Sequence, residues 1–284
     1  MVIIIDALIT KLNDDQFKLS DLGLEVLAVD VSAPSLSVDF REIRNRSGRV
    51  KAGSRFDKKE IKVSGYFSCK GLAALDNFID RLYGALVDED GYYLTKLTPI
   101  EDLYNFEVPG QKTGEVRTSQ VKHKAQKYRY HVINVGDIET SFKGLVQNTV
   151  TYLFVLRFET IGLPYGETIP KDITVTNSIP YAGTASNSQL ESPWVVKLTA
   201  TQSQKGDFYF TVGDRRFEHK SLTTINKDDV FHLHGVETWL NHRNINEYTN
   251  YEHFVLKPTR TNSIPIQTDF KGTIEILNYQ EFYK

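Results

Sequence analysis

Val150-Thr151-Tyr152-Leu153-Phe154-Val155-Leu156-Arg157-Phe158 is the stretch that decides the fold. Successive side chains of a β-strand point to opposite faces of its sheet. One face of this stretch is made entirely of large apolar side chains, those of Tyr152, Phe154, Leu156 and Phe158. The other face also carries polar groups, including Thr151 and Arg157. This pattern predicts a long strand with one face in a hydrophobic core.

The residues before this strand predict a first domain in which strands surround one helix. Segments 26–40, 60–67 and 127–135 alternate apolar and polar residues, as strands do. Between the last two, apolar residues recur at steps of three and four, a spacing typical of one helix face, at Leu72, Leu75, Ile79, Leu82 and Leu86. Ser68 is expected to cap this helix and Gly91 to end it. The basic stretch Arg41–Lys59, which contains two glycines, is expected to form a loop between two strands.

The bulk composition favours two β-rich domains. A chain of 284 residues exceeds the roughly 100 to 200 residues of an ordinary domain, and 15 Tyr with 16 Phe suit half-buried strands. A net charge of −2 gives no reason to expect tight binding to nucleic acid or to an anionic membrane. The lone Cys69 cannot form an intrachain disulfide. Residues 1–6 lack a basic start and fall short of the ~18 residues of a membrane span, so we expect synthesis in a cytoplasm.

A change of composition marks the predicted domain boundary. Between Ile161 and Pro193, prolines and glycines are scattered among Thr, Ser and Asn. The predicted fold class is mainly β: residues 1–165 form an N-terminal β-sandwich with one packed α-helix, 166–188 a linker, and 189–284 a C-terminal β-sandwich of short strands. The polar segment Pro99–Ala125 is longer than the ~12 to 15 residues of ordinary loops, which predicts an extended arm or a functional loop.

The residues offer no convincing catalytic or metal site. His232 and His234 would share one strand face and could bind a metal, but hydrogen-bonded or surface histidines explain such a pair more often. The acidic groups at 88–90 and 228–229 are read as turns, although paired carboxylates could in principle serve a glycosidase. There is no phosphate-binding glycine loop, and no serine or cysteine lies in a nucleophile motif. We therefore expect no enzyme activity, no cofactor and no metal.

Two groups of residues are candidates for binding surfaces. The basic stretch supplies possible subunit-contact residues, because a single basic run on a near-neutral chain is more often a subunit contact or a solvated face than a nucleic-acid site. These are Arg44, Arg46, Gly48, Arg49 and Arg55. In the second domain, amphipathic aromatic residues could bind a protein or a sugar, namely Trp239, Tyr248 and Tyr251. Trp194 begins a predicted strand and is expected in the core.

The order of features in the first domain resembles a known family. The run Ile43-Arg44-Asn45-Arg46-Ser47-Gly48-Arg49, the strand after it and the helix at 72–86 are similar to those of the distal tail proteins of long-tailed bacteriophages. The stretch Phe158-Glu159-Thr160-Ile161-Gly162-Leu163-Pro164-Tyr165-Gly166 resembles the way that family's first domain ends. The resemblance covers roughly residues 20 to 167. Over the second domain it rests only on a β-sandwich that ends in an alternating strand.

The resemblance implies a structural role in the virion. In that family the first domain forms a homo-oligomeric ring, expected to hold six copies, and the genome passes through its channel without specific binding. The second domain is a galectin-like β-sandwich. Expected partners are the tail tube protein, a tail-tip protein and a receptor-binding or other baseplate protein, with no membrane contact. The alternative function is a carbohydrate-binding adhesin module that recognises the host cell wall, and a glycoside hydrolase is a third reading.

Overall fold

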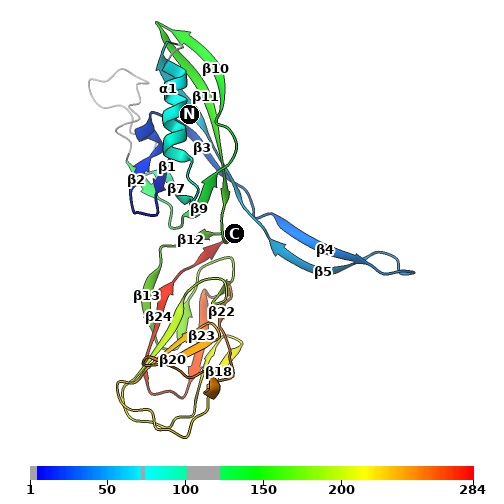
Figure 1. The fold of residues 1–284 in the computed structure, drawn as a ribbon, viewed down its shortest axis with the longest axis vertical. Helices are drawn as coiled ribbons and strands as arrows, with labels where there is room; N and C mark the ends of the chain where they lie inside the picture. Colours follow the sequence, from blue (N-terminus) through cyan, green and yellow to red (C-terminus); the bar gives the residue numbers. More distant parts are fainter. Residues whose placement is uncertain (1–4, 72–73, 101–121) are drawn as a thin grey trace. The chain divides into compact units, whose positions relative to one another are not determined.

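A computed structural model describes residues 5–71, 74–100 and 122–284 and shows two compact units, Met1–Gly166 and Glu167–Lys284 (Figure 1). Both units are built mainly from β-strands, and the described residues contain one α-helix. The predicted fold class, mainly β with one packed helix, is confirmed.

The first unit is organised around one large sheet. Its strands are β1 (Asp6–Thr10), β2 (Gln16–Lys18), β3 (Glu25–Val31), β6 (Glu60–Lys70), β7 (Tyr92–Pro99), β8 (His123–Ala125), β9 (Tyr130–Asn134), β10 (Glu139–Val146) and β11 (Thr149–Thr160). The order is β2-β1-β7-β9-β11-β6-β3, with β10 paired to β11 and β8 to β7. A short 3-10 helix, η1 (Leu19–Leu22), follows β2.

Strand β11 is the stretch from which the fold was predicted, and its prediction is confirmed. It pairs antiparallel with β6 from Thr149 opposite Lys70 to Glu159 opposite Glu60. Phe154, Leu156 and Phe158 are almost fully buried, as their shared face required. Because one face of this long pair is apolar, the alternation in the sequence fixes which side chains enter the core.

The helix α1 (Ala74–Leu86) packs on this sheet, as predicted. Leu82 and Leu86 are fully buried, and the ring of Phe78 stacks on that of Phe67 in β6 with centroids 4.3 Å apart. The predicted cap at Ser68 is wrong, because β6 continues to Lys70 and the Ser68 hydroxyl instead lies 3.0 Å from that of Thr151.

The expected helix end at Gly91 is too late. The helix ends at Leu86, and Gly91 has a positive φ of 71° in the turn before β7. Leu72 lies outside the described residues.

The predicted long loop begins and ends in strands. β7 runs to Pro99, which lies opposite His123 of β8, so the two ends of the Pro99–Ala125 segment are paired. Residues 101–121, on which the prediction of an arm or functional loop rests, lie outside the described residues.

The second unit is a sandwich of two main sheets, with orders β13-β24-β16-β19-β20-β21 and β14-β23-β17-β18. The strands of the first are β13 (Lys171–Val175), β16 (Val195–Ala200), β19 (Val230–His234), β20 (Glu237–Leu240), β21 (Arg243–Asn244) and β24 (Gly272–Tyr279). Those of the second are β14 (Ser178–Pro180), β17 (Phe208–Val212), β18 (Arg215–His219) and β23 (Ser263–Thr268).

The core of this unit is rich in aromatic side chains. Trp194, Phe210, Phe217 and Phe231 are fully buried, which places Trp194 in the core as expected. Smaller elements are β12 (Gly166–Glu167), β15 (Asn187–Ser188), β22 (Val255–Leu256), β25 (Phe282–Tyr283) and the 3-10 helix η3 (Asn246–Tyr248). The core joins residues from both main sheets, so each sheet buries one face against the other.

The structure departs from the predicted linker at 166–188. Strands β13 and β14 lie in this range and pair with β24 and β23, so they belong to the sheets of the second unit. Both are short, with five and three residues, and β14 ends in Pro180, so neither contains enough residues for an alternating pattern to be recognised in the sequence.

Candidate assembly site

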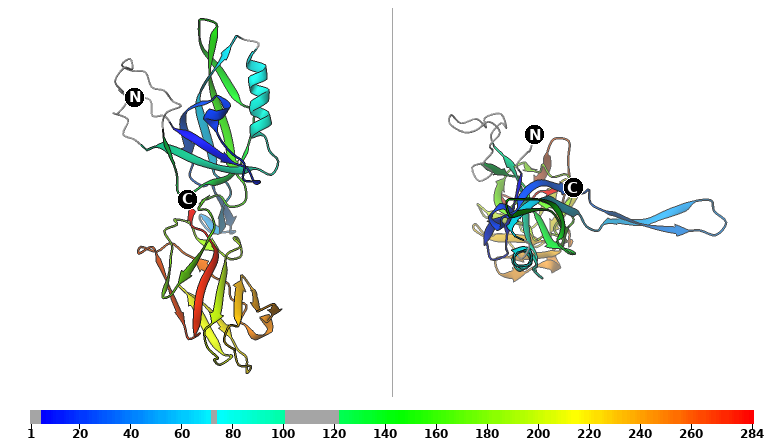
Figure 2. Two further views of the ribbon diagram at one scale, coloured as in Figure 1. Left: turned by 90° about the vertical axis from the view of Figure 1, so that its left-hand side faces the viewer. Right: turned by 90° about the horizontal axis from the view of Figure 1, so that it is seen from above.

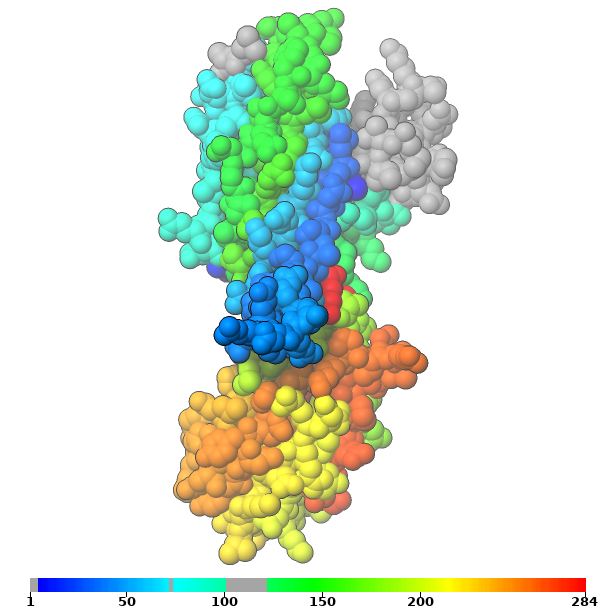
Figure 3. Space-filling view, turned by 90° about the vertical axis from the view of Figure 1, so that its right-hand side faces the viewer, coloured from blue at the N-terminus to red at the C-terminus, as the bar shows by residue number. Residues whose placement is uncertain are grey.

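Residues 36–56 form a β-hairpin that stands apart from the sheet of the first unit, and we call it the arm. Strand β4 (Leu36–Glu42) pairs with β5 (Arg49–Phe56), and within the described residues the two pair with no other strand. Figures 1 and 2 show the arm extending away from the rest of its unit. Figure 3 views it from its tip, where its residues are blue.

The loop predicted over Arg41–Lys59 is therefore wrong, because most of these residues belong to the arm. Paired strands usually reveal themselves by burying alternate side chains, and the arm buries none of its side chains fully. The structure brings all five predicted contact residues together on this arm. Arg44, Arg46 and Gly48 lie in its turn, Arg49 begins β5, and Arg55 lies near its base.

The register of the arm gives it one apolar face. Leu36 lies opposite Phe56, and Val38 opposite Ser54. A bulge after Asp39 then places Phe40 opposite Lys51. Leu36, Val38, Phe40 and Phe56 therefore share a face, because directly paired residues point to the same side of a hairpin.

Large apolar side chains of the arm are exposed in the single chain. Leu36 is 55% exposed, Phe40 49% and Ile43 49%. A two-stranded hairpin is only marginally stable in water unless its apolar face packs on something. This arm is therefore suited to pack on another protein surface.

The arm also concentrates positive charge. Residues 36–56 contain six Arg and Lys against two Asp and Glu, in a chain with a net charge of −2. The Arg49 guanidinium lies over the Phe40 ring, with its Cζ atom 4.5 Å from the ring centroid. Near the base, Arg55 Nε donates a hydrogen bond of 2.8 Å to Asp57. The other cations of the arm, Arg41, Arg44, Arg46 and Lys51, lie nearer the turn than Arg55 does.

The base of the arm is tied firmly to the first unit. Ser35 N donates to Lys58 O at 2.8 Å, and Asp57 N donates to Ser35 O at 3.0 Å. The ring of Phe56 meets Tyr165 edge-on, with centroids 6.2 Å apart. Lys58 forms ion pairs with Glu159 and Glu60, and the hydrogen bond to Glu159 raises the Lys58 pKa. These contacts anchor the base of the arm to the first unit.

A buried lysine completes this base. Lys59 is 3% exposed, and its Nζ atom lies 5.5 Å from the centroid of the Tyr130 ring. Its backbone N–H donates to the Thr160 hydroxyl at 2.9 Å, and the Thr160 N–H donates back to its carbonyl at 3.0 Å. Burial lowers the pKa of Lys59. Sequence reasoning missed this residue because a lysine beside a basic run carries no sign of burial.

The aromatic candidates of the second unit lie on different elements. Trp239, in β20, is 37% exposed and lies opposite His232 of β19. Tyr248 ends η3 and meets the ring of His219 in β18, with centroids 6.3 Å apart. Tyr251, 56% exposed, follows with a positive φ of 54°. The element η3 lies beside β20, where Thr238 N donates a hydrogen bond of 2.7 Å to Asn246 Oδ1.

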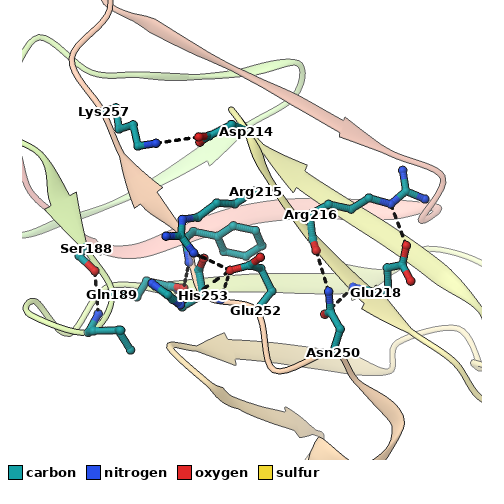
Figure 4. A network of polar contacts seen from close by, with 12 residues as sticks. Ser188, Gln189, Asp214, Arg215, Arg216, Glu218, Asn250, Glu252, His253 and Lys257 are labelled. Carbon is teal, nitrogen blue, oxygen red and sulfur yellow. Dashed lines mark hydrogen bonds and ion pairs between the residues drawn. The ribbon is translucent and has the colours of Figure 1, made fainter.

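A polar network holds the segment around Tyr251 against the β17–β18 hairpin (Figure 4). Arg215 Nη1 donates to Glu252 Oε1 at 2.7 Å. The Asn250 side chain donates to the Arg216 carbonyl at 2.8 Å and accepts from the Glu218 N–H at 3.0 Å. These hydrogen bonds hold Asn250 and Glu252, the neighbours of Tyr251 in the chain, and so stabilise the left-handed backbone conformation of Tyr251.

Positively charged neighbours lower the pKa values of two carboxylates near this network, those of Glu218 and Asp214. Lys220 and then Arg216 lower the Glu218 pKa, and the hydrogen bond from Lys257 lowers the pKa of Asp214.

His232 and His234 share a strand face as predicted, yet among the described residues no group of three His, Cys, Asp or Glu side chains could hold a metal ion. Within the same residues, no helix is long and apolar enough to cross a membrane.

Of the comparisons with known proteins, the one with solved structures finds similar folds. No family model and no curated protein sequence matches the chain. In fold, the chain is similar to the distal tail proteins of bacteriophages. The crystal structure of the SPP1 Dit protein, described as a paradigm of the hub adsorption apparatus in phages that infect Gram-positive bacteria, matches with a TM-score of 0.61.

That match covers 98% of this chain and 99% of the SPP1 protein at 13% identity, and it establishes the fold. The phage P2 baseplate in its activated conformation with Ca also matches over 99% of this chain and 98% of that chain, with 10% identity and a TM-score of 0.36.

Proposed function

We propose that this protein is a non-enzymatic structural subunit of a phage tail tip that assembles into a ring through its arm. The arm carries this proposal, since it exposes an apolar face and a cluster of cations while its base is fixed. The similarity of fold to the SPP1 hub protein supports a place in the virion tail.

The proposed contact joins two different surfaces. The arm of one copy packs on the first unit of the next, with Leu36, Phe40 and Ile43 buried in the contact. A contact of this head-to-tail kind closes into a ring when the rotation between neighbours permits it. Six copies are expected from the family resemblance. The genome passes through the ring without specific binding, which agrees with the absence of a strongly basic total charge.

In this proposal the ring joins the tail tube to the tip, and the second unit docks receptor-binding or other baseplate proteins. The sandwich of the second unit supports this role because its exposed aromatic side chains suit protein contacts. The subunit is made in the host cytoplasm and ends in the virion.

The test compares assembly of the full chain with that of an arm variant. Sedimentation and negative-stain electron microscopy of the wild type should show a ring. The double substitution Leu36→Ser with Phe40→Ser should yield monomers with unchanged circular dichroism. Leu222→Ser is the control, because Leu222 is fully exposed in the second unit and should leave the ring intact. A chain that stays monomeric at every concentration, or rings that survive the double substitution, would refute the proposal.

A further inference from the structure

One row of side chains crosses the larger sheet of the second unit. Lys197 of β16 lies opposite Glu275 of β24 on one side and His232 of β19 on the other. His232 lies opposite Trp239 of β20, which in turn lies opposite Asn244 of β21. We call these five residues the row. Neighbouring strands are about 4.8 Å apart, so the row is about 19 Å long.

The row lies on the face of the sheet that points away from the core. The residues on either side of each central member are buried, as Phe231 and Leu233 show for His232, and Val196 and Leu198 for Lys197. Since side chains alternate along a strand, the row points to the opposite face. Trp239 is 37% exposed, so its ring is available to a ligand.

The polar members of the row combine donors and acceptors. Lys197 Nζ lies 2.8 Å from Glu275 Oε2, so their charges balance each other. Asn244 Oδ1 accepts a hydrogen bond of 3.0 Å from Asn246 N, and no hydrogen bond of its NH₂ group is found among the described residues. The row therefore offers hydrogen-bonding groups at both ends without a net charge.

The centre of the row pairs an imidazole with an indole. Within the described part of the chain, no hydrogen bond of the His232 ring is found, and burial, Lys197 and His242 lower its pKa. A neutral imidazole donates at one nitrogen and accepts at the other. Beside it, the indole Nε1–H of Trp239 donates a hydrogen bond of 3.4 Å to Glu237 Oε2.

We propose that the row is a binding site for a neutral saccharide chain. The apolar C–H face of a sugar ring packs on an exposed indole, while its hydroxyl groups both donate and accept hydrogen bonds. The row supplies this combination in one line: an indole at Trp239, an imidazole beside it, and donors and acceptors on either side. Its balanced charge fits a neutral chain better than an anionic one. This activity is separate from the ring contact, which is made by the arm.

The test uses the full-length protein and a printed array of neutral and acidic bacterial oligosaccharides, followed by titration of the best neutral oligosaccharide. Trp194 and Trp239 are the two tryptophans of the chain, and Trp194 is fully buried, so a fluorescence change on titration reports Trp239. We expect Trp239→Ala to weaken binding about ten-fold or more, equivalent to about 1.4 kcal/mol. His232→Ala should also weaken it.

Phe142→Ala is the matched control, because Phe142 is a 62% exposed aromatic residue of the first unit, outside the row, and its loss should leave affinity unchanged. Sedimentation of Trp239→Ala distinguishes this proposal from that of the ring, since this variant should still assemble. Absence of binding to every oligosaccharide on the array would overturn the proposal. So would binding that is unchanged in Trp239→Ala, or a stronger preference for acidic chains.

Discussion

The guanidinium group of Arg49 covers the ring of Phe40 on the arm, with 4.5 Å between Cζ and the ring centroid. Both residues lie on the same face of a hairpin that pairs with no other strand of the described chain. Contacts between a cation and an exposed ring contribute only about 0.5–1 kcal/mol, and more once water is excluded. The pair therefore becomes more favourable when another surface covers it.

Arg49→Ala should weaken ring assembly while leaving the stability of the single chain within about 0.5 kcal/mol, as is usual for exposed positions. Sedimentation equilibrium measures the first quantity and urea unfolding the second. Arg243→Ala serves as a control, because Arg243 is an exposed arginine of the second unit. Equal effects of both substitutions on assembly would argue against a specific role of the arm.

Phe67→Ala should destabilise the first unit by about 3–5 kcal/mol, the usual cost of removing a buried phenylalanine ring. Phe67 is 1% exposed and its ring stacks on Phe78, so the substitution removes this contact between β6 and α1. Phe142→Ala is the comparison, because Phe142 is 62% exposed and should cost much less. Urea unfolding followed by circular dichroism gives both values.

Two glycine substitutions should have opposite effects. A Cβ atom on Gly65 would come within 2.0 Å of the Glu25 carbonyl oxygen, so Gly65→Ala should push β3 away from β6 and destabilise the first unit. Gly84 lies inside α1 with nothing within 4 Å of a Cβ atom, so Gly84→Ala should stabilise it by about 1 kcal/mol. Melting temperatures that move in the same direction would contradict this prediction.

The stability of the second unit should fall in acid because of His219. This side chain is 4% exposed, its Nδ1 lies 2.6 Å from the Gly206 carbonyl oxygen, and burial lowers its pKa. Below about pH 6.5 the unfolded chain binds a proton that the folded imidazole resists, so stability is present above that pH and declines below it. His219→Gln should therefore reduce the loss of stability between pH 7.5 and 5.

The measurement for this prediction is urea unfolding followed by the fluorescence of the buried Trp194. His234→Gln is the control, because His234 is an exposed histidine of the same unit and its replacement should leave the loss of stability in acid as in the wild type. An unchanged pH dependence in His219→Gln would assign the acid sensitivity to other groups.

Burial explains which parts of the fold could be predicted. Strand β11 and helix α1 each bury one face, so their apolar residues repeat with the period of the element. The arm buries neither face against its own chain, so its sequence has no clear period and predicts a loop. Strands β13 and β14 were predicted as part of a linker because they have only five and three residues and lie among scattered prolines and glycines.

The candidate sites, too, can be predicted from the sequence only in part. The residue types are visible in the sequence, which predicts candidate roles for Arg49, His232 and Trp239. Their neighbours cannot be predicted, because the row joins residues of five strands and only strand register places Glu275 beside Lys197 and Lys197 beside His232. A basic run could likewise be found in the sequence, whereas its presentation on an arm with a fixed base depends on pairing that involves no buried side chain.

The fixed base of the arm has a consequence for how a ring would form. If each subunit gives one arm and receives one, an open arc of any length retains one uncovered arm and one empty acceptor surface at its ends. The last subunit removes both at once, so closure gains a contact that no intermediate has. Complete rings should then dominate over partial arcs at equilibrium, and a single subunit with a defective arm should act as a chain terminator.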